Sequence, residues 1–394
     1  MKTALFRRTL LGIMALGFAW IHGAMSGFAA PQLSDTNKPA EVVRLFFIHH
    51  STGENWLRDD YGRLGIALRD NNYFVSDSNY GWGPDGIGDT TDIGHWYQWF
   101  RSARASTYLA AVFDSSDRNC EYSRPTSVPA GPNQVILFKS CFPNSALQGA
   151  PGDLIPDIGK NRLRNQDSGS PYHTVGNAKG IYQDLLNCFA ANTNKLFVVI
   201  TAPPLSDPTW ADNARAFNQW LVHEWLKDYP YANVFVFDFY NVLTSNGGSA
   251  GVSDLGQATG HHHRWWADAV QHQVGGGGNV LAYRSGDDHP NAVGSRKATA
   301  EFVPLLNAAV RAWQASLQGS PAPPRFDHCQ VTAENVSLRI SGMSAGFAYA
   351  LQRSTDLGEG NWIHLAIFSG VSSTNWSETI SPQTQGCYYR IVSP

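Results

Sequence analysis

A serine that could act as a nucleophile stands at the end of an apolar run. Residues 46–57 read FFIHHSTGENWL, so Ser51 follows a strand-like pattern and precedes a helix-like one. A serine hydroxyl becomes a good nucleophile when a base, usually a histidine, takes its proton. The same turn could instead be a plain helix cap or, through its two histidines, part of a metal site. Residues elsewhere in the chain have to distinguish these three roles.

The best candidate for the base is His289, in the segment SGDDHPNAVGS. It follows the apolar run NVLAY and precedes the last helix-like stretch, with Asp287 and Asp288 directly before it. A carboxylate this close in sequence can orient an imidazole if the turn curls back. The segment also fits a polar loop ahead of a helix, with Asn291 near the N-cap position.

An acyl-transfer site also needs hydrogen-bond donors aimed at the developing oxyanion. Asn144 follows the apolar run QVILF, within KSCFPNS, and offers a side-chain amide. Backbone N–H groups near Ser51, and of Gly81 or Gly83 in YGWG, could supply further donors. Pro-Asn-Ser is equally a turn signal, so Asn144 gains weight only from its position relative to the other candidates.

Strand-like runs alternate with helix-like stretches over most of the chain. The strand-like runs are Val42–Ile48, Tyr73–Val75, Gln134–Phe138, Lys195–Thr201 and Asn233–Phe239. Helical spacing occurs at Leu57, Tyr61, Leu64 and Leu68 and over residues 174–191, 210–227 and 293–315. This alternation predicts an α/β domain with a parallel sheet covered on both faces. Ligands of such sheets bind at the C-terminal ends of the strands, where Ser51, Asn144 and His289 would meet.

These motifs together resemble those of GDSL/SGNH-type hydrolases, a three-layer α/β/α family of esterases and acetylesterases. The resemblance spans about residues 42–315 and implies a role for each matched residue. Ser51 would be the nucleophile and His289 the base. Asn144 and a glycine, Gly81 or Gly83, would form the oxyanion hole.

Three positions depart from the family pattern. His49-His50-Ser51 stands in place of Gly-Asp-Ser, and CFPNS stands in place of Gly-x-Asn-Asp. Gly286 occupies the position three residues before His289, where the family carries its acid. The acid is then Asp287, Asp288 or absent. We expect Asp287, because Asp288 would more readily point away or cap the helix. His50 is interpreted as a structural or pocket residue.

A second polar cluster, GHHHRWW at residues 260–266, lies between the last predicted strand and His289. His262, Arg264 and Trp265 are predicted to line a substrate pocket, where arginine binds carboxylate and tryptophan stacks on sugar. A His-rich tract can also bind metal, or form an ordinary polar loop.

The first 29 residues have the pattern of a secretory signal peptide. Three cations (Lys2, Arg7 and Arg8) precede an apolar stretch that ends at the small-x-small site Gly27-Phe28-Ala29. An uncleaved N-terminal anchor is the alternative. No later segment is apolar enough to cross a membrane, so we expect a secreted or periplasmic protein. The formal net charge of -3 gives no basic excess for nucleic-acid binding.

A Pro-rich linker, GSPAPPR at residues 319–325, divides the chain. It would separate an α/β domain (30–318) from a small β-sandwich module (326–394). The tail resembles a C-terminal module of secreted bacterial proteins, through residues 351–357 (LQRSTDL), Trp362 and residues 388–390 (YYR). Cys329 and Cys387 flank this module and are expected to pair. The pairing of the remaining cysteines, Cys120, Cys141 and Cys188, stays open.

The sequence therefore predicts a secreted serine esterase that needs no cofactor. O-acetyl groups on carbohydrate are the expected substrate, because the protein carries a leader, 12% aromatic residues and an accessory module. One alternative is a metal-dependent hydrolase using His49, His50 and residues 261–263. Another is a non-catalytic carbohydrate-binding protein on a hydrolase scaffold. The oligomeric state is left open.

Overall fold

The computed structural model describes two compact units, which meet along the chain between Gln314 and Ala315. In the first unit the described residues are 36–244, 263–266, 269–272 and 279–314. In the second they are 315–317, 325–332, 335–343, 348–354, 362–369, 371–379 and 388–392. The predicted signal peptide lies outside these ranges. Within them, no helix is both long enough and apolar enough to span a membrane.

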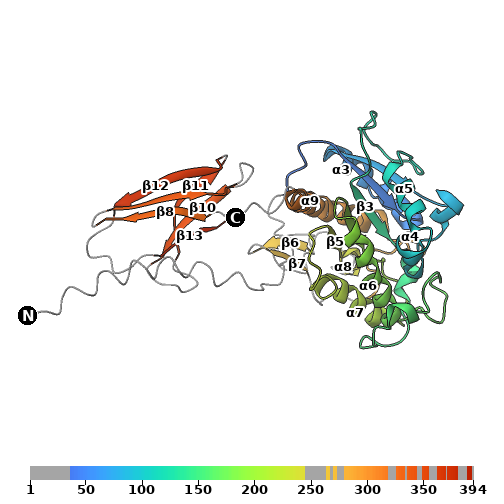
Figure 1. Ribbon diagram of the computed structural model, residues 1–394. Coiled ribbons are helices and arrows are strands. Elements are labelled where there is room, and N and C mark those ends of the chain that lie inside the picture. Colours follow the sequence, from blue (N-terminus) through green and yellow to red (C-terminus); the bar gives the residue numbers. More distant parts are fainter. Residues whose placement is uncertain are drawn as a thin grey trace, which may run out of the picture. The chain divides into compact units, whose positions relative to one another are not determined.

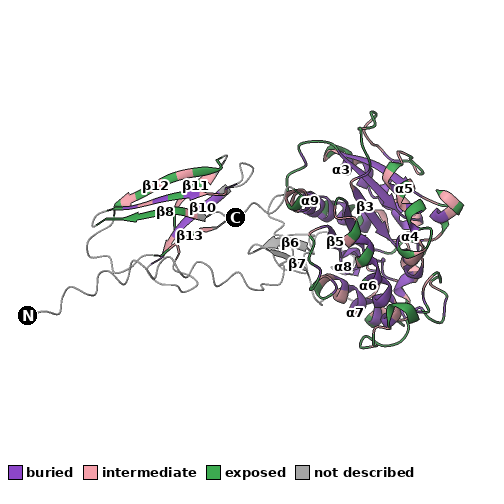
Figure 2. Ribbon diagram, in the orientation of Figure 1, coloured by how far each residue is buried: buried purple, intermediate pink, exposed green. Residues whose placement is uncertain are grey.

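The first unit is built on a five-stranded parallel sheet with the strand order β2-β1-β3-β4-β5 (Figure 1). Its strands are β1 (Val43–Ile48), β2 (Tyr73–Ser78), β3 (Val135–Lys139), β4 (Leu196–Ile200) and β5 (Val234–Phe237). Each of the five predicted strands begins within one residue of the observed one. Nearly every strand residue is buried, as Figure 2 shows. Continuous apolar runs suit this position because both faces of a parallel sheet are covered.

Helices cover both faces of the sheet, and alternate strand residues define the two cores. Leu45 and Phe47 of β1 pack in one core. That core includes residues of α2 (Ser51–Leu57), α3 (Leu64–Asp70), α8 (Phe239–Thr244) and α9 (Ala292–Leu317). Phe46 and Ile48 point to the other face, against α4 (Trp96–Arg101), α5 (Ala105–Asp114), α6 (Val175–Ala191) and α7 (Ala211–His223). The α/β prediction is confirmed.

Predicted helix positions are accurate for the longest helices and less so elsewhere. The patterns over 174–191 and 293–315 are observed as α6 and α9, whereas α7 ends at His223, four residues early. The spacing from Leu57 to Leu68 does not form one helix. The chain turns between α2 and α3, where Arg63 has a φ of 62°. Gly62 lies so close to the Trp56 carbonyl that a Cβ would stand 2.3 Å from its oxygen.

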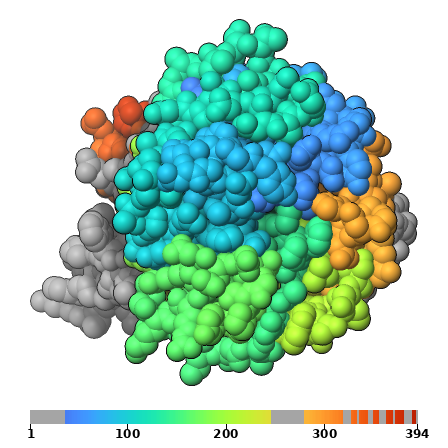
Figure 3. Space-filling view, turned by 90° about the vertical axis from the view of Figure 1, so that its right-hand side faces the viewer, coloured from blue at the N-terminus to red at the C-terminus, as the bar shows by residue number. Residues whose placement is uncertain are grey.

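The C-terminal edge of the sheet collects segments that are far apart in the sequence. Ser51 follows β1, the segment from Asn79 follows β2, and Cys141 lies two residues beyond β3. Figure 3 shows one face of the molecule on which surfaces coloured blue-cyan, green and orange lie side by side. Chemistry-bearing residues of distant segments can therefore meet at this edge.

The second unit contains two three-stranded antiparallel sheets, ordered β11-β10-β13 and β12-β9-β8. Their strands are β8 (Arg325–Val331), β9 (Asn335–Ser341), β10 (Ala348–Ser354), β11 (Ile363–Ser369), β12 (Ser373–Thr379) and β13 (Tyr388–Val392). Val336, Leu338 and Ile340 of one sheet share a core with Tyr349 and Leu351 of the other. The predicted all-β tail is confirmed.

The cysteines form no disulfide within the described part of the chain. Cys329 is exposed on β8, and its expected partner Cys387 lies outside the described residues. Their pairing stays a prediction. Cys120, Cys141 and Cys188 are free thiols.

Candidate active site

Ser51 and His289 are hydrogen-bonded although 238 residues separate them in sequence. The Ser51 Oγ atom lies 3.0 Å from Nε2 of His289. Ser51 is the first residue of α2, and the extended backbone of His50 (φ −127°, ψ −175°) turns the chain from β1 into that helix. The half-buried serine is thus presented at the edge of the sheet beside an imidazole.

His289 is oriented by Asp287. The Nδ1 atom of the imidazole lies 3.0 Å from Oδ2 of that carboxylate. The Oδ1 atom accepts the His289 backbone N–H at 2.9 Å and the Ser285 hydroxyl at 2.8 Å. These two hydrogen bonds, followed by the contact with the imidazole, lower the pKa of Asp287 to about 2. The carboxylate is therefore ionised at neutral pH.

Asp288, the other candidate acid, is directed elsewhere. Its Oδ1 atom accepts the backbone N–H of Ser206 at 2.8 Å, in the loop that follows β4. The turn of residues 285–289 thus directs two successive carboxylates to different neighbours.

His50 is buried, and both its ring nitrogens are engaged. Nε2 contacts the Gly88 carbonyl oxygen, and Nδ1 lies 3.0 Å from the Thr91 hydroxyl. Burial lowers the pKa of His50. The ring of Tyr80 stacks on His50 at 4.1 Å and is 63% exposed. His50 therefore has no free ring nitrogen for a substrate, and it supports an exposed aromatic side chain instead.

The predicted oxyanion donors have acceptors inside the protein. The buried amide of Asn144 donates to Asp92 Oδ1 at 2.6 Å and to the Cys141 carbonyl at 3.3 Å. The backbone N–H of Gly81 donates to Asp89 Oδ1 at 2.7 Å. Each of these two donors would have to release an acceptor before binding an oxyanion. The Ser51 N–H is at the start of α2, where a helix offers no acceptor for it.

The sequence interpretation assigned no role to Cys141 and Lys139, which lie beside the serine. Cys141 Sγ is 3.3 Å from Ser51 Oγ and 3.4 Å from Thr52 Oγ1. The fully buried Lys139 places Nζ 3.9 Å from the same sulfur. Burial alone would raise the pKa of the Cys141 thiol. The Lys139 charge and hydrogen bonds with Ser51 and Thr52 outweigh that effect and lower it.

A signal for this arrangement was present in the sequence. A lysine at the end of the apolar run QVILFK is unusual for a strand buried on both faces, because burying an ammonium group is costly. Two further neighbours were not singled out. The Phe142 ring contacts the His289 ring edge-on at 4.9 Å. The Tyr80 ring stacks on His50, the residue directly before Ser51.

The predicted substrate residues of the GHHHRWW segment are only partly described. His262 lies outside the described residues. Arg264 and Trp265 belong to β6 (His263–Trp266), which pairs antiparallel with β7 (Ala269–His272). The directions of their side chains are outside what the structure describes, so their role in binding stays a prediction.

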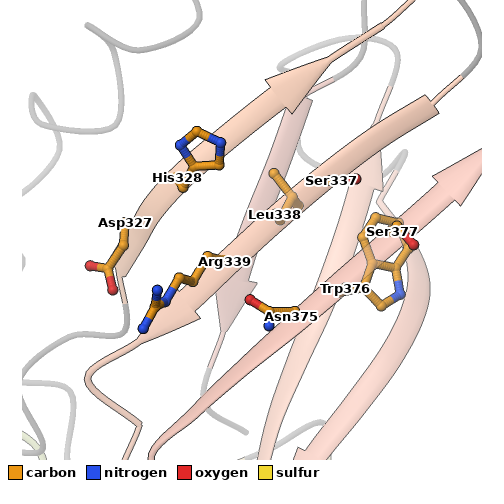
Figure 4. A pocket seen from close by; sticks show the side chains of 8 residues that line it. All are labelled: Asp327, His328, Ser337, Leu338, Arg339, Asn375, Trp376 and Ser377. Atoms are coloured by element: carbon orange, nitrogen blue, oxygen red, sulfur yellow. The ribbon is translucent and has the colours of Figure 1, made fainter.

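Two surface pockets are lined by residues other than the Ser51–His289 pair. One, of about 620 Å³, is on the outer face of the β12-β9-β8 sheet (Figure 4). Asp327, His328, Arg339 and Asn375 are among its lining residues. The other, of about 940 Å³, is lined by Glu54 of α2, by residues 58–60 and by residues 118–124. Ser51, Asp287 and His289 line neither pocket.

Comparison of the chain with protein-family models, with curated proteins and with solved structures finds no match.

Proposed function

We propose that this protein is a secreted serine esterase of the GDSL/SGNH type. The observation that carries the proposal is the hydrogen-bonded chain from Ser51 Oγ to His289 Nε2 and from His289 Nδ1 to Asp287 Oδ2, with 3.0 Å at each step. A hydroxyl, an imidazole and a carboxylate in this order form the arrangement that activates a serine for acyl transfer.

In the proposed reaction, Ser51 Oγ attacks the ester carbonyl while His289 Nε2 takes the hydroxyl proton. The tetrahedral intermediate collapses, the bond to the alcohol oxygen breaks, and His289 returns the proton to the departing alcohol. A water molecule then attacks the acyl-serine by the same steps and releases the acid. Asp287, ionised beside Nδ1, stabilises the imidazolium that forms twice in the cycle.

The charge that develops on the carbonyl oxygen needs a partner in both steps. The Ser51 backbone N–H is the donor that requires no rearrangement. The Asn144 amide would join it by releasing its acceptor Asp92, and the Gly81 N–H by releasing its acceptor Asp89, so that both donate to the oxyanion. The buried Lys139 contacts Cys141 next to Ser51, and burial lowers the pKa of its ammonium group.

We propose acyl groups on carbohydrate, O-acetyl above all, as the substrate class. The exposed Tyr80 ring stacks on His50, the residue directly before Ser51, and offers an apolar face for a sugar ring. The signal-like leader and the all-β tail support an extracellular substrate.

A fluorophosphonate probe tests the reaction class, because it labels only an activated serine. We expect the exported protein to be labelled, Ser51→Ala to be unlabelled, and Ser106→Ala, which removes an exposed serine of α5, to be labelled like wild type. Hydrolysis of p-nitrophenyl acetate should follow the same order. Turnover that survives in Ser51→Ala would favour the metal-dependent alternative. Absent labelling together with absent turnover in the wild type would favour the binding protein.

A further inference from the structure

Three potential metal ligands converge in the first unit, outside the proposed catalytic groups. His49 directly follows β1, Asp77 lies in β2, and Cys120 lies in the segment between α5 and β3. One ligand atom from each lies within 4.8 Å of the other two. His49 Nε2 is 3.1 Å from Asp77 Oδ2, and Cys120 Sγ is 3.4 Å from the same oxygen.

We propose that His49, Asp77 and Cys120 bind one zinc ion, which braces the turn that carries Ser51. Zinc takes nitrogen, oxygen and sulfur ligands at about 2.0–2.3 Å in tetrahedral geometry. Two ligands of one tetrahedral ion then lie about 3.3–3.7 Å apart. The observed separations of 3.1 and 3.4 Å for the two pairs that include Asp77 are close to that spacing, and the His49–Cys120 pair lies within 4.8 Å.

Neighbouring groups hold these ligands in place. Asp77 Oδ1 accepts the Tyr122 hydroxyl and the Asn119 backbone N–H, both at 2.8 Å, which leaves Oδ2 directed at His49 and Cys120. His49 Nδ1 lies 3.4 Å from the His50 carbonyl oxygen. A proton on Nδ1 would leave Nε2 as the ligand atom. In metal centres, the non-ligating carboxylate oxygen and the second imidazole nitrogen are typically held by hydrogen bonds of this kind.

Charge balance also favours a divalent cation. His49 and Asp77 are completely buried. Zinc would bind Cys120 as the thiolate, forming a Zn–S bond and releasing the thiol proton as H⁺. One divalent ion, one thiolate, one carboxylate and a neutral imidazole sum to zero charge, which suits a buried position.

The cluster has access to solvent on one side. Cys120, Asn119 and Tyr122 line the pocket of about 940 Å³ described above. That pocket gives the ion a path of entry and a water molecule as its fourth ligand. Ser51 does not line this pocket.

The proposed ion acts on the turn between β1 and α2. His49 is two residues before Ser51, and Gly53 packs so tightly on it that a Cβ there would stand 2.4 Å from His49 Cβ. A ligand bond at Nε2 would restrain both ends of the turn. The ion is therefore structural, and its loss is expected to affect stability before chemistry.

Metal content of the exported protein, purified without chelators, tests this proposal. We expect about one zinc per chain in the wild type. The matched control Cys188→Ser, which removes another buried cysteine, should keep it, whereas Cys120→Ser and Asp77→Asn should lose it. Zinc retained by Cys120→Ser would overturn the proposal and point to residues 261–263. So would a wild type that neither contains zinc nor gains thermal stability when zinc is added.

Cobalt substitution gives a readout that does not depend on how the variants fold. Cobalt in the wild-type site should show a thiolate-to-cobalt charge-transfer band in the near ultraviolet, and Cys188→Ser should keep that band. Cobalt-loaded wild type without the band would overturn the assignment of Cys120 as a ligand, as would a band that persists in Cys120→Ser.

Discussion

Ser51 Oγ lies 3.3 Å from Cys141 Sγ, so the proposed nucleophile contacts a thiol as well as an imidazole. The sheet register explains this pair. Ile48 of β1 is opposite Phe138 of β3. Ser51 lies three residues after Ile48, and Cys141 lies three residues after Phe138. The thiol has a lowered pKa and is half-buried, conditions under which cysteines react readily.

Modification of Cys141 is therefore expected to block the serine. Methyl methanethiosulfonate should abolish fluorophosphonate labelling of the wild type, because an added thiomethyl group would occupy the space beside Ser51 Oγ. Dithiothreitol should restore it. Fluorophosphonate labelling of Cys141→Ser should survive treatment with methyl methanethiosulfonate, whereas labelling of Cys188→Ser should be lost as in the wild type. Equal resistance of both variants would contradict the expected effect.

The two aspartates before His289 provide a matched pair of substitutions. Asp287→Asn should lower kcat/KM by about 10²–10⁴-fold, since the imidazole loses the carboxylate that orients it. Asp288→Asn changes a carboxylate that, within the described residues, accepts a backbone N–H of a distant loop, and it should stay within about tenfold of wild type. Steady-state kinetics on p-nitrophenyl acetate would measure both. The opposite ranking would assign the acid to Asp288.

The pH profile should separate Asp287 from other titrating groups. Its pKa of about 2 is depressed, so its ionised form stabilises the fold above the ordinary value near 3.8 and loses this effect as the pH falls through about 2. Asp287 is therefore ionised throughout pH 4–8. An acid limb of kcat/KM in that interval should persist in Asp287→Asn at a lower plateau. A limb that disappears in this variant would show that Asp287 titrates there.

The side chain of Asn144 makes hydrogen bonds that stabilise its turn, and the same amide is a candidate oxyanion donor. Asn144→Ala removes the donor to Asp92 and the acceptor for the Ile93 N–H, so Tm should fall. If the amide also binds the oxyanion, kcat should fall by about 10²–10³-fold. The control is Ser145→Ala, which loses one buried bond, to the Pro203 carbonyl, in the same turn. Its Tm should fall with little change in kcat. Equal loss of kcat in the two variants would leave Asn144 a structural role only.

Much of the first unit could be predicted from the sequence because its signals are local. A strand covered on both faces is mostly apolar, so β1, β3 and β4 stand out as near-continuous apolar runs, broken only by Arg44 and Lys139. The rule that functional residues follow the C-terminal ends of parallel strands then selected Ser51 and Asn144 without knowledge of the strand order. It does not account for His289, because the run NVLAY before that residue forms no strand of the sheet.

The contacts between the candidate residues depend on the strand order and on the path of each turn. Neither of these can be predicted from local composition. The choice between Asp287 and Asp288 depends on how residues 285–289 curl, because adjacent side chains in a turn point to different neighbours. Because β3 pairs with β1, Cys141 comes beside Ser51. Because β2 pairs with β1 on its other edge, with Phe47 opposite Asp77, the Asp77 carboxylate comes within reach of His49. The amino-acid sequence by itself specified which residues could do chemistry and at which edge of the sheet. Only the tertiary structure decided which of them touch, since contacts between distant segments depend on sheet register and loop geometry.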